Sequence, residues 1–95
     1  MVNAYMTPIT NQNIIELLGF EIDKKMTNMI CNFYPDRIVY RSKNHRYMLQ
    51  QTGNNIVNNG GWNLHIDNSA FESLASCDVE YIEQIETLID IYKNY

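Results

Sequence analysis

Residues 62–67 read Trp-Asn-Leu-His-Ile-Asp, a strict alternation of apolar and polar side chains. Because successive side chains of a β-strand point to opposite faces, this period of two predicts a half-buried strand. Trp62, Leu64 and Ile66 then share the core face, where the single tryptophan serves as an aromatic anchor rather than a binding hot spot. The opposite face carries Asn63, His65 and Asp67.

Upstream of this strand, turn-forming residues divide the chain into short apolar runs, which is typical of strands in a meander. Pro35-Asp36 and residues 42–44 separate the first runs, and the asparagines and glycines between residues 54 and 61 supply the turn before Trp62. Strands so close in sequence pair antiparallel. The predicted strands cover residues 29–34, 37–41, 46–52 and 62–67.

A short helix is expected before the strands. Thr7 or Thr10 can cap its start, Pro8 suits its first turn, and Gly19 suits a left-handed exit. The apolar residues of this helix are Ile14, Ile15, Leu17 and Leu18.

The chain after Asp67 has the pattern of helical structure. Ser69-Ala70-Phe71-Glu72 fits a capping box, so a short helical turn is expected there. A longer amphipathic helix is predicted to start near Asp78 and to cover residues 79–92, packed on the sheet. Its apolar face consists of Tyr81, Ile82, Ile85, Leu88, Ile89 and Tyr92. The sequence therefore predicts an α+β fold: a short N-terminal helix, an antiparallel meander of about four strands, and a C-terminal amphipathic helix packed on the sheet.

The size and composition of the chain predict one domain over residues 1–95. A hydrophobic fraction of 45% argues against disorder, but 95 residues leave a thin margin of stability that a homodimer would increase. No apolar run approaches the length of a membrane span, and no signal peptide is recognisable, so a cytoplasmic protein is expected. Cys31 and Cys77 are expected to be reduced, buried thiols.

Charge is distributed unevenly along the chain, whose net charge is −4. After Ile66 there are seven acidic residues and a single base, Lys93. On the predicted C-terminal helix, four of the acids fall on the side opposite the apolar face. These four form a predicted acidic ridge of Glu80, Glu83, Glu86 and Asp90. Such a ridge either keeps the protein soluble or docks on a basic surface of a partner.

A basic segment with interleaved aromatic residues lies between residues 34 and 47. This mixture suits stacking and phosphate contact with single-stranded nucleic acid, although it also suits a hairpin with tyrosines in the core and arginines at the rim. A protein of net negative charge is repelled by nucleic acid, so this function is the weaker alternative. Its candidate residues are Tyr40, Arg41, Arg46 and Tyr47.

Catalytic and metal-binding patterns are weak in this sequence. His65 and Asp67 share a strand face, and Ser69 or Ser73 follows closely, but the strained turn that normally presents a nucleophilic serine is missing. Two distant histidines and two isolated cysteines do not match a zinc site. The sequence therefore predicts a protein that is not an enzyme and that uses no metal or other cofactor.

The segment 61–68, Gly-Trp-Asn-Leu-His-Ile-Asp-Asn, is followed by Phe71 and by Asp-Val-Glu-Tyr-Ile at residues 78–82. Together with Leu-Leu-Gly-Phe at residues 17–20, it resembles small uncharacterised proteins of Bacteroidetes and their phages, which share a G-W-x-x-H-I-D-N-like segment before a C-terminal helix. The resemblance implies a shared fold and a phage or bacterial genomic setting, and it transfers no catalytic or binding residue.

These observations lead to three hypotheses. The first is a phage or mobile-element protein that binds and inhibits a host defence protein through its acidic helix, whose carboxylates would replace phosphates. The second is a single-stranded nucleic-acid binder. The third is a structural protein that associates with itself through its basic and acidic surfaces.

Overall fold

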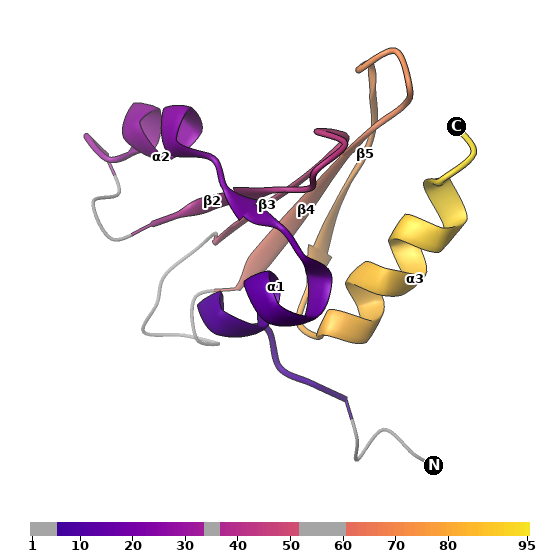
Figure 1. The fold of residues 1–95 in the computed structure, drawn as a ribbon, viewed down its shortest axis with the longest axis horizontal. Coiled ribbons are helices and arrows are strands. Elements are labelled where there is room, and N and C mark those ends of the chain that lie inside the picture. Colours follow the sequence, from indigo (N-terminus) through magenta and orange to yellow (C-terminus); the bar gives the residue numbers. More distant parts are fainter. Residues whose placement is uncertain (1–5, 34–36, 52–60) are drawn as a thin grey trace.

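The computed structural model describes residues 6–33, 37–51 and 61–95 and has an α+β fold (Figure 1). Five strands form one antiparallel sheet in the order β1-β2-β3-β4-β5, so each strand pairs with its neighbour in sequence. The elements in chain order are α1 (Asn11–Leu18), β1 (Glu21–Ile22), α2 (Lys24–Ile30), β2 (Val39–Arg41), β3 (Tyr47–Gln51), β4 (Trp62–Asp67), β5 (Ser73–Val79) and α3 (Ile82–Tyr92).

The core lies between the sheet and a layer formed by α1 and α3. Strand β4 has the predicted alternation, with Trp62, Leu64 and Ile66 buried and the residues between them half-buried. Across the sheet, Leu49 pairs with Leu64, and Ile66 pairs with Tyr47. From the helices, Ile14, Ile82 and Ile85 are fully buried against this face.

Helix α1 confirms the predicted capping signals. The Thr10 hydroxyl accepts a hydrogen bond from Asn13 N at 3.1 Å, and Gly19 ends the helix in the left-handed region with φ of 71°. Pro8 does not occupy the first turn as predicted, because Thr10 rather than Thr7 is the N-cap. Instead, Pro8 forms an isolated bridge with Tyr81, which brings the N-terminal segment beside the start of α3.

The predicted strand over residues 29–34 is wrong in its described part, because α2 occupies residues 24–30. The Asp23 carboxylate caps this helix by accepting a hydrogen bond from Met26 N at 3.0 Å. That bond, together with the Arg41 guanidinium at 2.8 Å, lowers the pKa of Asp23 below its ordinary value. Thr27 Oγ1 accepts a hydrogen bond from Val39 N, so α2 covers the edge of β2 beyond the short β1.

The region between β4 and α3 also differs from the prediction. Residues 69–72 form a loop rather than a helical turn, because Asn68 Oδ1 accepts hydrogen bonds from Ala70 N and Glu72 N and turns the chain back. Residues 73–79 then pair with β4 as β5, and α3 starts at Ile82 rather than near Asp78. The Gln84 side chain fixes this start by accepting hydrogen bonds from Glu80 N and Tyr81 N.

The predicted turns at residues 35–36 and 54–60, and the ends of the strand predictions at residues 34 and 52, lie outside the described residues. In the described parts of the chain, no helix combines the length and apolar character needed to cross a membrane.

Candidate functional site

The acidic ridge predicted from the sequence is divided in the structure. Glu80 precedes α3, while the other three acids lie on the helix within about 60° of one another at 100° per residue. Glu80, Glu86 and Asp90 are exposed, whereas Glu83 is half-buried. We call these four residues together the acidic face of α3; three of them lie on the helix, and Glu80 lies in the link between β5 and α3.

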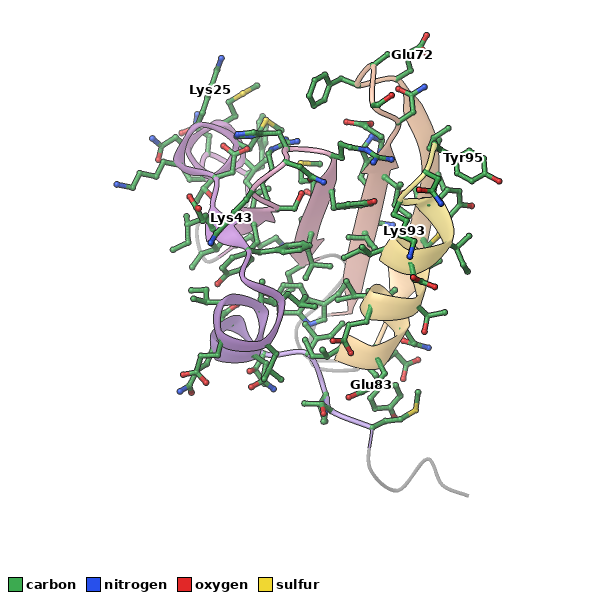
Figure 2. All side chains as sticks on the ribbon, turned by 45° about the vertical axis from the view of Figure 1, so that its right-hand side comes forward. Lys25, Lys43, Glu72, Glu83, Lys93 and Tyr95 are labelled. Atoms are coloured by element: carbon green, nitrogen blue, oxygen red, sulfur yellow. The ribbon has the colours of Figure 1, made fainter. Side chains whose placement is uncertain are left out.

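Glu83 holds the N-terminal segment in place. Thr7 N donates to Glu83 Oε1 at 2.7 Å, and the Thr7 hydroxyl donates to Oε2 at 2.9 Å. Two main-chain bonds flank this contact: Ile82 N donates to Thr7 O, and Ile9 N donates to Glu80 O. Because the Thr7 main-chain bond stabilises the charged carboxylate, the pKa of Glu83 lies below its ordinary value of 4.5. Figure 2 shows Glu83 at the end of α3 where this segment passes.

The Thr7–Glu83 contact predicts a pH-dependent stability. A carboxyl whose folded-state pKa is lowered stabilises the fold above its unfolded-state pKa and loses that contribution as the pH falls through the folded-state value. Glu83→Gln is therefore expected to lower the urea midpoint at pH 7, and the gap from wild type should narrow as the pH falls below the ordinary carboxyl pKa of 4.5 and through the lower folded-state pKa. Equilibrium unfolding over this pH range measures the gap. Glu86→Gln is the matched control, and an equal gap for both variants would contradict the assignment to Glu83.

The remaining acids of this face are more available to a partner. Lys93 Nζ lies 2.8 Å from Asp90 Oδ1, and this contact raises the pKa of Lys93. Both side chains are exposed, so the pair is weak and open to competition. Glu80 and Glu86 form no side-chain hydrogen bond or ion pair with any described residue. The acidic face therefore offers two unengaged carboxylates and a third in a weak pair.

The alternative nucleic-acid residues do not form one surface. Tyr40 and Tyr47 are 1% and 3% exposed, and burial raises the pKa of the Tyr40 hydroxyl. With both rings inside the core, neither is placed to stack on a base. The Arg41 side chain lies on the opposite face of β2 from Tyr40 and forms an ion pair with Asp23.

Arg46, the fourth of these residues, is bound within the fold. Its guanidinium donates to Asp67 O at 3.0 Å, Tyr92 O at 2.9 Å and Lys93 O at 3.1 Å. These bonds satisfy carbonyls at the C-terminal end of α3 and join that end to β4. The C-terminal end of a helix is the favourable place for a cation.

The polar face of β4 contains the His65–Asp67 pair expected from the alternation. His65 Nε2 lies 2.9 Å from Asp67 Oδ1. Ser76 of β5 lies opposite His65 in the sheet, but its hydroxyl donates to Asn63 Oδ1 at 3.0 Å rather than contacting the imidazole. Ser69 lies in the hairpin loop, and Ser73 pairs with Asp67 at the bulge between β4 and β5. The described residues thus contain no serine bonded to this histidine.

The described residues form a groove on the helix side of the sheet but no metal-binding cluster. An open groove of about 380 Å³ lies between the end of α1, the β2–β3 turn and α3, with Lys43 at its wall. Its apolar walls, which include Phe20 and Tyr47, belong to the core, and its Ser42 hydroxyl is already bonded to Asn44 Oδ1 and Tyr47 N. Across residues 6–33, 37–51 and 61–95, no three histidine, cysteine, aspartate or glutamate side chains come together in a group able to hold a metal ion.

Comparisons of this chain with protein-family models, with curated proteins and with solved structures find no match.

Proposed function

We propose that this chain is a non-enzymatic protein-binding domain that docks on a basic surface of a partner through the acidic face of α3. The observation that carries the proposal is the exposure of Glu80, Glu86 and Asp90, of which only Asp90 is paired with a cation of the described residues, Lys93. A surface of one sign steers a partner of the opposite sign and weakens as salt screens it.

The rigid placement of this face supports the proposal. Helix α3 is fixed to the sheet by Ile82 and Ile85, at its N-terminal end by the Thr7–Glu83 contact and at its C-terminal end by Arg46. A preorganised surface loses little conformational entropy on binding. The backbone that carries Glu83, Glu86 and Asp90 is thus fixed before any partner arrives.

The proposed partner is a protein of a bacterial host cell, in keeping with the resemblance of the 61–68 segment to proteins of Bacteroidetes and their phages. Defence nucleases bind nucleic acid in basic channels, and carboxylates spaced along a helix could occupy such a channel in place of phosphates. Inhibition would then follow from competition with nucleic acid.

Affinity capture from a bacterial lysate tests the proposal, with and without nuclease and with mass spectrometry of the bound proteins. Glu80→Lys/Glu86→Lys is the test variant, and Glu21→Lys/Glu72→Lys is the control on exposed positions outside the acidic face. Each Glu→Lys change raises the charge by two, so both double variants move from −4 to 0.

We expect wild type and control to retain one partner whose capture survives nuclease treatment. The test variant should retain at least about tenfold less of it, and a tenfold loss of affinity corresponds to a binding free energy of about 1.4 kcal/mol. Equal retention by both variants would contradict docking through α3. Recovery of nucleic-acid-dependent proteins only would favour the nucleic-acid alternative.

A further inference from the structure

The two edges of the sheet differ in how much of their main chain is covered. One edge is formed by β1, which has only two residues. Beyond β1, α2 covers the edge of β2, because Thr27 Oγ1 accepts a hydrogen bond from Val39 N. At the other edge is β5, the longest strand of the sheet with seven residues. A strand at an open edge presents unpaired N–H and C=O groups, which form a template for pairing with another extended chain.

The hydrogen bonds between β3, β4 and β5 determine which main-chain N–H and C=O groups of β5 point outward, away from β4. Asp67 N donates to Arg46 O on the β3 side, so in an antiparallel ladder the alternate residues Leu64 and Ile66 turn their main-chain groups toward β5. Leu64 pairs with Cys77 of β5, and Ile66 pairs with Ala75. The main-chain groups of Cys77 and Ala75 therefore point toward β4. Ser76, between those partners, therefore directs its N–H and C=O outward, and Asp78 does the same.

Among the described residues, the outward edge of β5 is bonded only beyond the end of the strand. Ile9 N donates to Glu80 O at 3.2 Å, so the N-terminal segment covers the chain just after the strand. No main-chain bond from a described residue reaches the outward groups of Ser76 or Asp78. The open stretch is therefore residues 73–78.

The sequence of β5 lacks most devices that block pairing at an edge. It contains no lysine, proline or glycine, and its bulge lies at its first residues, opposite Ile66 and Asp67. Its single charged residue, Asp78, accepts a hydrogen bond from Asn63 Nδ2 at 3.3 Å across the polar face of the sheet. The centre of the strand, at Ala75 and Ser76, is small and neutral.

Helix α3 presents an apolar side chain on the same flank of the molecule. Ile89 lines the groove next to Leu18 and Phe20, which marks the α1 side of α3. Ile91 lies about 160° around the helix from Ile89, on the side away from α1, and is 54% exposed. In Figure 1 helix α3 as a whole lies beside β5. Glu86 lies about 140° around the helix from Ile91, so the acidic face points elsewhere.

We propose that β5 pairs antiparallel with β5 of a second copy of this chain, about a two-fold axis near Ser76, to give a continuous ten-stranded sheet. An antiparallel pair of identical strands satisfies the two-fold symmetry of a closed dimer. The α3 helices of the two copies then flank the axis on the same face of the sheet, with Ile91 between them. The opposite edge consists of the two-residue β1 and, beyond it, of α2 over β2, so assembly stops at two copies. Glu86 and Asp90 on α3 stay exposed in both copies.

Sedimentation velocity and multi-angle light scattering over about 1–200 μM protein test this dimer. We expect twice the chain mass at the upper end of this range. Ser76→Pro removes an N–H to which no described residue bonds, along with the exposed Ser76–Asn63 side-chain bond, and proline is tolerated at sheet edges. Ile91→Glu places a charge at the axis. Each variant is expected to weaken dimerisation at least tenfold while the far-ultraviolet circular dichroism of the monomer stays unchanged.

Ile15→Glu is the matched control, because Ile15 is a similarly exposed isoleucine, 47% accessible, on α1. It should leave the dimer intact. A wild type that stays monomeric throughout, or a dimer that Ser76→Pro and Ile91→Glu do not weaken, would overturn the inference. Neither result bears on partner capture through the acidic face, so the two proposals fail separately.

Discussion

Leu64→Ala is expected to lower the free energy of unfolding by about 2–5 kcal/mol. Leu64 is 0% exposed at the centre of β4, where it pairs with Leu49 on one side and Cys77 on the other. Its truncation removes apolar contacts and leaves a cavity that the flanking strands cannot close. Urea denaturation followed by tryptophan fluorescence measures the change.

Asn63→Ala is the control for this prediction, since Asn63 is the preceding residue of β4 and lies half-buried on the polar face. It should cost about 1 kcal/mol or less, because its hydrogen bonds to Ser76 and Asp78 lie in exposed surroundings. Equal losses for the two variants would contradict the assignment of the core to the helix side of the sheet.

Arg46→Ala is expected to cost about 2–3 kcal/mol, because one half-buried guanidinium donates to Asp67 O, Tyr92 O and Lys93 O. Arg46→Lys should recover little of this loss, since an ammonium group lacks the planar fork that reaches three carbonyls. Thermal and urea unfolding measure both variants.

Lys43→Ala is the control for Arg46. Lys43 is exposed and bonded to no described side chain, so its loss should change stability by no more than about 0.5 kcal/mol. If Arg46→Ala were as stable as Lys43→Ala, the guanidinium would be free for another role, such as contact with phosphate.

The parts of the fold that the sequence predicted are those with strong local signals. The alternation at Trp62–Asp67 matches β4, and Thr10 and Gly19 mark the ends of α1. Strand β5 was missed because Ser73–Val79 contains one β-branched residue, Val79, and its inward positions Ala75 and Cys77 are small. Its extended conformation comes from pairing with β4 rather than from intrinsic propensity.

Helix α2 was missed for a different reason. The apolar residues Met26, Met29 and Ile30 fit a helix period, but the predicted strand began at Met29 and left Asp23 out of the pattern. The cap at Asp23 decides the conformation of this segment.

The sequence predicted which residues belong to the candidate site, but it predicted only part of their arrangement in space. The sequence placed Glu83, Glu86 and Asp90 on one side of a helix, as α3 has them. It could not predict the Thr7–Glu83 contact, which joins residues 76 positions apart. Nor could it separate Tyr40 and Tyr47 from Arg41 and Arg46, because burial depends on which sheet face the helices cover.

The central claim, docking through the acidic face of α3, is tested most directly by calorimetric titration of the purified captured partner. Wild type, Glu80→Lys/Glu86→Lys and Glu21→Lys/Glu72→Lys would be compared at low and high salt. We predict a dissociation constant at least tenfold higher for the first double variant, a change of less than about twofold for the second, and a smaller difference between them at high salt. Equal affinities for the two double variants at low salt would contradict the claim.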